Sequence, residues 1–138
     1  MTGLYLDINF IAFLVSSVLA FSLGVIWYHP KVMGAKWAEA RGKKIEDMDK
    51  GALPLVGSFF LWLLAACFYA FLAEFLGIDN EAGYICLACL LWVAFSMPSS
   101  LMGALYTGYP FEAVAIDTSC LLGGYYVFAV VHIAFMYV

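Results

Sequence analysis

The residue best suited to chemistry in this sequence is Asp117, an acid inside a long run of apolar residues. Ionisable side chains within an apolar span are costly in a bilayer and therefore mark candidate ligand, ion or proton sites. At a rise of about 1.5 Å per residue, Asp117 lies roughly 7–8 Å from the start of its expected helix. Hydroxyl side chains are expected near the same depth: Ser22, Ser58, Ser96, Ser99, Ser100 and Thr118. Together these residues predict a polar layer inside the protein.

The middle of the third apolar run contains Pro98, which removes one backbone donor and should bend its helix. The carbonyl of Ala94 would then be free to accept a hydrogen bond. Because no expected span contains Lys or Arg, we expect Asp117 to be at least partly neutral and to bond to this carbonyl and the serines. The layer then serves either as a small polar or cationic binding site or only as interhelical hydrogen bonding that fixes packing.

Two further pairs have residue types that could react. Cys86-x-x-Cys89 lies in the outer turns of the third run, where a membrane thiol oxidoreductase could place its cysteines, although cysteine also packs as a small apolar residue. Glu74 and His132 lie at matching depth near the opposite end from Asp117, either as an acid–base pair or facing the headgroups. No His, Cys and carboxylate cluster has metal-ligand spacing, so we expect no metal, no cofactor and no catalytic residue.

The elements that must position these residues are four long apolar helices. The chain has 138 residues, of which 66% are hydrophobic and only 12% charged, so its solvent must be lipid. Four runs are long enough to cross a bilayer, near residues 8–28, 53–76, 83–106 and 112–136, and in lipid such runs must be helical. The short turns predict one all-α domain of two antiparallel hairpins.

The distribution of charge predicts the orientation. All six basic residues lie in the loop 29–52: Lys31, Lys36, Arg41, Lys43, Lys44 and Lys50. Positive loops stay in the cytoplasm, so both termini should be external in the cell's inner membrane. The loop is too short and too mixed in charge for nucleic-acid binding.

Where the first run ends, aromatic residues predict an anchor at the membrane surface. The anchor residues are Trp27, Tyr28, Pro30 and Trp37. Trp and Tyr prefer the headgroup level, and Pro30 should end the span. Met33, Trp37 and Ala40 then recur at helical spacing, which predicts a short interfacial helix that ends at Gly42.

The pattern Gly24-x-x-Trp27-Tyr28-x-Pro30-x-x-x-Gly34-x-x-Trp37 resembles the N-terminal signature of a bacterial family of small four-span membrane proteins, domain of unknown function 1761. The similarity continues through the segment 91–98, Gly108-Tyr-Pro110, Ile116-Asp117 and Gly124-Tyr125. The resemblance implies a fold and a membrane location. It implies no activity and no catalytic residues.

Three functions remain open from the sequence. The first is an oligomeric binding or transport module around Pro98 and Asp117. The second is a structural or accessory subunit whose small faces, Ser119-x-x-x-Gly123 and Cys120-x-x-x-Gly124, pack against another subunit. The third is a thiol oxidoreductase. Four helices enclose little space, so besides the lipid bilayer we expect a homo-oligomer or a larger membrane complex.

Overall fold

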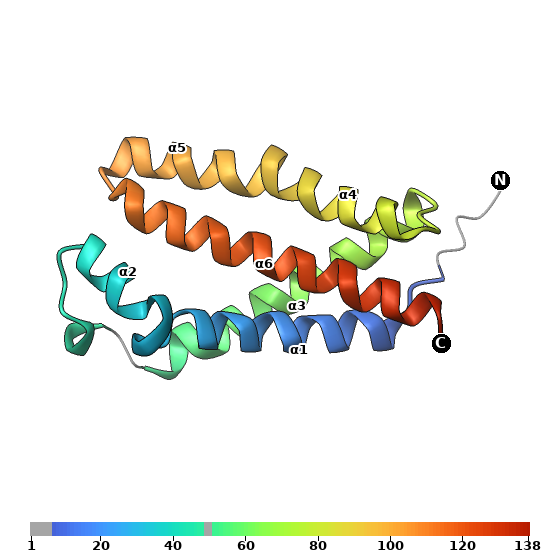
Figure 1. Ribbon diagram of the computed structural model, residues 1–138, viewed down its shortest axis with the longest axis horizontal. Helices are drawn as coiled ribbons and strands as arrows, with labels where there is room; N and C mark the ends of the chain where they lie inside the picture. The colour runs from blue at the N-terminus through green and yellow to red at the C-terminus, as the bar shows by residue number, and fades with distance from the viewer. Residues whose placement is uncertain (1–6, 49–50) are drawn as a thin grey trace.

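The structure is a computed structural model that describes residues 7–48 and 51–138, and within these ranges every regular element is helical. Figure 1 shows its long helices lying alongside one another. The α-helices are α1 (Phe10–Trp27), α2 (Ala35–Ala40), α3 (Ala52–Phe75), α4 (Glu81–Leu91), α5 (Met97–Thr107) and α6 (Phe111–Met136). Lys50, one of the six basic residues of the loop, lies outside the described residues.

Four helical segments are long and apolar enough to cross a membrane: Phe10–Trp27, Ala52–Phe75, Glu81–Thr107 and Phe111–Met136. This confirms the predicted all-α class with four apolar spans, which is the architecture of a multi-pass membrane protein. In Figure 1 the chain runs along α1, returns along α3, and repeats this reversal with α4–α5 and α6.

Helix α6 lies at the centre of the packing, with α1 on one side and α4–α5 on the other (Figure 1). Helix α3 packs mainly against α1 rather than against α6. The core lies toward the end opposite α2, where Tyr69 and Phe128 are fully buried among alanines of four helices. At the α2 end, Ala113 and Val114 at the start of α6 are buried, but α5 has no buried residue. Helix α5 is therefore the least covered helix at this end.

The third span is interrupted before Pro98 by a π-helical turn, η3 (Trp92–Ser96). The N–H of Met97 bonds to the carbonyl of Trp92, five residues earlier instead of four. Such a turn adds one residue to the helix and is a cause of helix kinks, as Pro is. The sequence predicted a bend at Pro98 but did not indicate this change of register just before it.

The chain leaves α1 through a sharp corner. His29 is extended, with ψ 139°, as expected before a proline, and its Nδ1 accepts a hydrogen bond from the N–H of Lys31 at 3.2 Å. A second π-helical turn, η1 (Pro30–Gly34), then leads into α2. Gly34 packs so closely on the preceding turn that an added Cβ would lie 2.2 Å from the carbonyl oxygen of Tyr28. The corner thereby folds α2 back onto α6.

Candidate functional site

Asp117, in the second turn of α6, accepts hydrogen bonds from two phenols, one on each carboxylate oxygen. The Oη of Tyr28 lies 2.6 Å from Oδ1, and the Oη of Tyr109 lies 3.0 Å from Oδ2. Tyr28 follows α1 directly, and Tyr109 lies in the turn between α5 and α6, which Gly108 enters with φ 70°. The carboxylate thus joins the end of α1 to the turn before its own helix.

Aromatic and basic residues of α2 and its end cover the two phenols. The rings of Tyr28 and Trp37 meet edge to face, with 5.0 Å between their centroids. The guanidinium of Arg41 lies 4.6 Å from the centroid of the Trp37 ring and 5.6 Å from that of Tyr109. Burial, together with the hydrogen bond to Asp117 and its charge, raises the pKa of Tyr109, so this phenol remains a donor at neutral pH.

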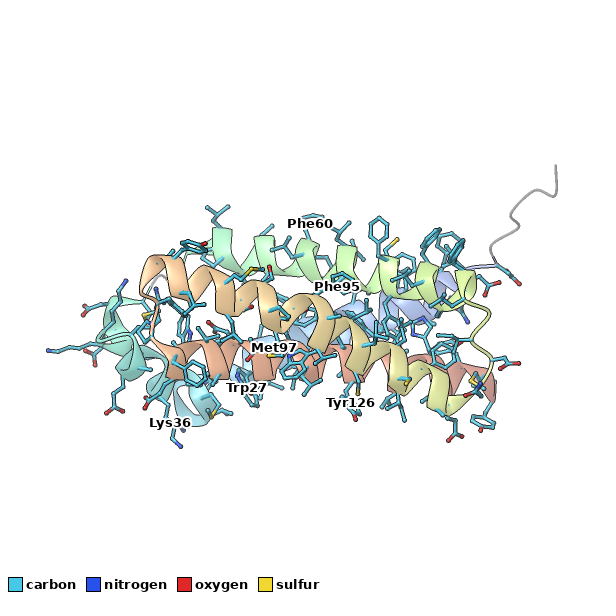
Figure 2. All side chains as sticks on the ribbon, turned by 90° about the horizontal axis from the view of Figure 1, so that it is seen from above. Trp27, Lys36, Phe60, Phe95, Met97 and Tyr126 are labelled. Atoms are coloured by element: carbon cyan, nitrogen blue, oxygen red, sulfur yellow. The ribbon has the colours of Figure 1, made fainter. Side chains whose placement is uncertain are left out.

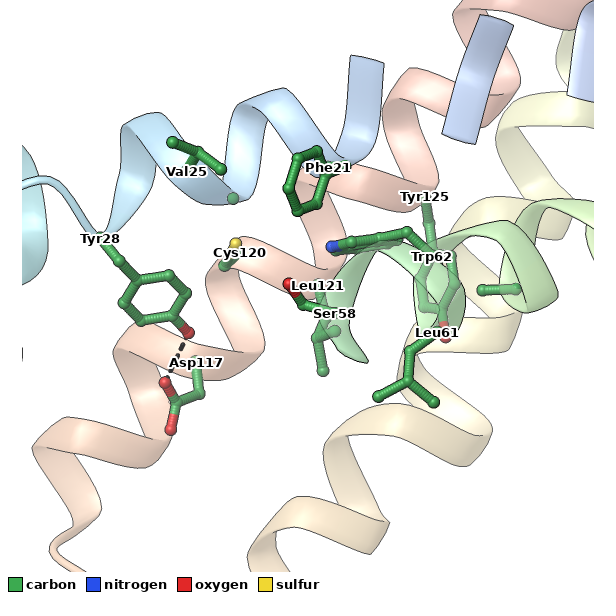
Figure 3. A pocket seen from close by; sticks show the side chains of 12 residues that line it. Phe21, Val25, Tyr28, Ser58, Leu61, Trp62, Asp117, Cys120, Leu121 and Tyr125 are labelled. Atoms are coloured by element: carbon green, nitrogen blue, oxygen red, sulfur yellow. Dashed lines mark hydrogen bonds between the residues drawn. The ribbon is translucent and has the colours of Figure 1, made fainter. Parts of the chain in front are cut away.

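Beside Asp117 lies a cavity of about 300 Å³ between α1, α3 and α6 (Figure 3). Asp117 and Tyr28 lie at one end, and the rings of Phe21, Trp62 and Tyr125 lie at the other. Leu61 of α3 also lines this cavity and is 68% exposed. The cavity, called the aromatic chamber below, therefore combines one carboxyl group with aromatic walls and an apolar side chain at its exposed edge.

A second hollow of about 290 Å³ lies on the other side of Asp117, between α5 and α6. Hydroxyl groups of Ser100, Thr107 and Tyr109 are among its lining groups. Thr107 is the last residue of α5, so this hollow reaches the α2 end of the bundle. Asp117 is the residue common to both hollows.

The predicted polar layer is only partly assembled. Ser58 lines the aromatic chamber with Asp117, and Ser100 lines the second hollow, although each donates its own hydrogen bond within its helix. Ser22 lies in a separate apolar groove between α1 and α6, and Ser99 is exposed. Ser96 reaches the chamber indirectly, because its Oγ lies 2.7 Å from the Oη of Tyr125.

The expected partners of Asp117 were wrong. The sequence interpretation paired it with serines and the carbonyl that Pro98 frees, whereas its oxygens bond to Tyr28 and Tyr109. Serine hydroxyls are short and satisfy themselves on the preceding turn of their own helix, as Ser100 does on the carbonyl of Ser96. The longer phenols can cross between helices.

Four aromatic residues around Asp117 were given no role or another role by the sequence interpretation. Trp62 and Tyr125 of the chamber and Tyr109 of the second hollow were given no role, and Tyr28 was assigned to the membrane surface. One signal existed for Tyr109, which stands beside Pro110 immediately before the helix that contains Asp117. For Trp62, the signal would have been the small residue opposite it, since its ring packs directly on Gly124.

The residues assigned as surface anchors bond largely within the protein. The indole Nε1 of Trp27 donates to the carbonyl of Ile116 at 3.1 Å, and the hydroxyl of Tyr28 donates to Asp117. Trp37 is half-buried, and its Nε1 is a buried donor without a partner among the described residues. Pro30 is exposed at the corner. The aromatic corner therefore joins α1 and α2 to the start of α6.

Glu74 and His132 are not brought together as an acid–base pair. Glu74 is exposed, and its Oε1 lies 3.4 Å from the backbone N of Asp7. His132 is buried, with Nδ1 2.8 Å from the carbonyl oxygen of Phe128 and its ring against Tyr69. Within the described ranges, no three His, Cys, Asp or Glu side chains are placed to hold a metal ion.

Cys86 and Cys89 are both free thiols one helical turn apart on α4, the first exposed and the second half-buried. We expect the free energy of unfolding of the double variant Cys86→Ala/Cys89→Ala to lie within about 1 kcal/mol of the wild-type value, because little packing is lost. Thermal unfolding in one fixed detergent measures this, with the buried Cys120→Ala as the more destabilised comparison. A disulfide between Cys86 and Cys89 that changes the unfolding temperature on reduction would contradict the expectation.

Comparison with known proteins places the chain in a family. Searches of curated proteins and of solved structures find no match. A family model described as a protein of unknown function, DUF1761, matches residues 11–133, which include α1 through most of α6. The matched region contains the corner, the aromatic chamber and Asp117. The chain belongs to the DUF1761 family of proteins of unknown function.

Proposed function

We propose that this four-span protein is a ligand-binding module of the inner membrane and that Asp117 is its central binding residue. The observation that supports this most is a carboxylate at the end of an aromatic cavity of about 300 Å³. Among the described residues, no Lys or Arg nitrogen lies within 4.0 Å of a carboxylate oxygen of Asp117, which is the distance of an ion pair. A space large enough for a small ligand therefore adjoins Asp117, whose side chain has no cationic partner among the described residues.

The partners of Asp117 among the described residues are polar but not cationic. Both of its oxygens accept hydrogen bonds from phenols. A carboxylate without a cation is an unusual feature of a membrane span, because charge at this depth is costly. A ligand with a positively charged group would offset that cost, whereas a purely structural role has no use for the adjoining space.

The small faces that motivated the structural alternative have contacts within this copy of the protein. Its small faces on α6 were expected to contact another subunit, but Gly123 packs on Leu23 of α1 and Gly124 packs on Trp62 of α3. These close approaches occur within one copy. We propose that oligomerisation, if it occurs, uses the apolar outer faces instead, such as that of α3, where Phe60 points away from the bundle (Figure 2).

Native mass spectrometry of protein purified in its own lipids tests the binding function. A bound small molecule should remain on the wild type and on Glu112→Gln, a matched variant at an exposed acid of the same helix. It should be depleted on Asp117→Asn, which keeps the shape and removes the charge. If all three proteins are free of ligand and the cavity excludes added small molecules, the proposed function fails.

The orientation follows from the basic loop, which we propose to be cytoplasmic, with α2 lying along the inner leaflet. Lys36 and Lys43 are exposed at this end of the molecule. In a background without the four native cysteines, we expect Lys43→Cys to react with an impermeant maleimide only after the cells are opened. Asn80→Cys in the same background, in the turn between α3 and α4, should react in intact cells. The reverse pattern would place the loop outside.

A further inference from the structure

We propose that the ligand is an aromatic or lipophilic organic cation, with its charged nitrogen at Asp117 and its apolar body between aromatic rings. This inference rests on the proposed binding function and specifies the ligand class. The chamber places the charge and the rings at opposite ends of one space (Figure 3). An elongated ligand with one cationic end matches that arrangement.

The carboxylate end selects for positive charge and against strong hydrogen-bond donors. Both oxygens of Asp117 already accept a phenolic hydrogen bond, so each has less capacity left for further donors. A quaternary ammonium group needs no hydrogen bond and interacts through charge alone. The phenol ring of Tyr28 also lines the chamber, where its face adds attraction for a cation.

The aromatic end selects for a flat or apolar body. Phe21 and Trp62 come from α1 and α3, so a ring between them contacts two helices at once. Gly24 faces Trp62, with a hypothetical Cβ 3.6 Å from the indole Nε1, and this small residue leaves the indole accessible from the α1 side. The indole of Trp62 thus offers its ring to an aromatic or apolar body, at the end of the chamber away from the charged nitrogen.

The mouth selects for a ligand that enters from lipid. Val25 and Leu61 line the chamber and are 48% and 68% exposed, so apolar side chains form part of its exposed edge. A hydrophilic cation would have to lose its hydration before it reached Asp117. A lipophilic cation already resides in the membrane near this opening.

The test compares two isosteric probes, benzyltrimethylammonium and uncharged neopentylbenzene, added to the full-length protein in nanodiscs. Saturable quenching of tryptophan fluorescence reports binding. We expect the cation to bind at least about tenfold more tightly than the neutral probe, because a desolvated charge pair is lost with the latter. Asp117→Asn should abolish this preference, and Glu112→Gln should retain it.

A second pair of variants tests the aromatic wall. Trp62→Leu should weaken binding of benzyltrimethylammonium roughly threefold to tenfold, because the phenyl ring of the probe loses its aromatic partner. Competition with a labelled cation measures this affinity, because the variant has lost one of the fluorophores. Phe60→Leu, on the outer face of the same helix, should leave affinity unchanged. Equal affinities for the two probes, or a preference that survives Asp117→Asn, would overturn the cation assignment. If a neutral molecule occupies the cavity in native mass spectrometry, the ligand class fails while the binding function stands.

Discussion

Replacing Asp117 with Leu is expected to destabilise the protein by about 2–4 kcal/mol, because two phenolic hydroxyls lose their acceptor in a half-buried site. Asp117→Asn should cost less than about 1 kcal/mol. The amide oxygen can accept from one tyrosine, and the amide nitrogen can donate to the oxygen of the other. Equilibrium unfolding in a fixed mixed micelle measures both changes.

The same mechanism predicts non-additivity with the tyrosines. Tyr28→Phe should be costly in the wild type, where it leaves Oδ1 without its donor, and nearly neutral after Asp117→Leu. Tyr109→Phe should behave in the same way toward Oδ2. If Asp117→Leu is as stable as the wild type, the two hydrogen bonds do not join α1 to α6, and the corner must be held by packing alone.

The helical architecture could be predicted because length and apolar content decide it in a bilayer. The four expected spans agree with the four apolar helices. Asp117 was singled out because it is an acid inside one of these runs, and its partners were expected from its depth. Depth does not specify on which side of a helix a residue lies. Ser22 was placed at the level of Asp117 but lines a groove with Tyr126 elsewhere on α6. The partners of a buried group therefore could not be derived from its depth.

The two phenols that bond to Asp117 show a different limit. Tyr28 was expected to end the first span at the membrane surface and Tyr109 to lie in a turn, and in the structure both lie just beyond helix ends. A phenol is long enough to reach back from a turn to a carboxylate one or two helical turns inside. The π-helical turn before Pro98 adds a further uncertainty, because one extra residue rotates every later side chain of that span by about 100°.

Among changes that add one methyl group to the corner, Gly34→Ala should destabilise the protein most. Its Cβ would lie 2.2 Å from the carbonyl oxygen of Tyr28 and 2.9 Å from the carbonyl carbon of His29. These are backbone atoms of the preceding turn, so no rotation of a side chain relieves the overlap. We expect a loss of about 1–3 kcal/mol, typical of an overpacked site.

Gly57→Ala on α3 and Gly103→Ala on α5 are the matched controls, because nothing lies within 4 Å of a Cβ at either position. Both should be neutral or stabilise the protein by up to about 1 kcal/mol through helix propensity. A double-mutant cycle that combines Gly34→Ala with Asp117→Leu measures whether the corner controls the hydrogen bond at Asp117. If Gly34→Ala shifts the turn that holds Tyr28, the hydrogen bond to Asp117 is already weakened, and Asp117→Leu should cost clearly less in that background. Additive effects would mean that the overlap is relieved within η1 and α2, without movement of Tyr28, and that the corner does not control the carboxylate.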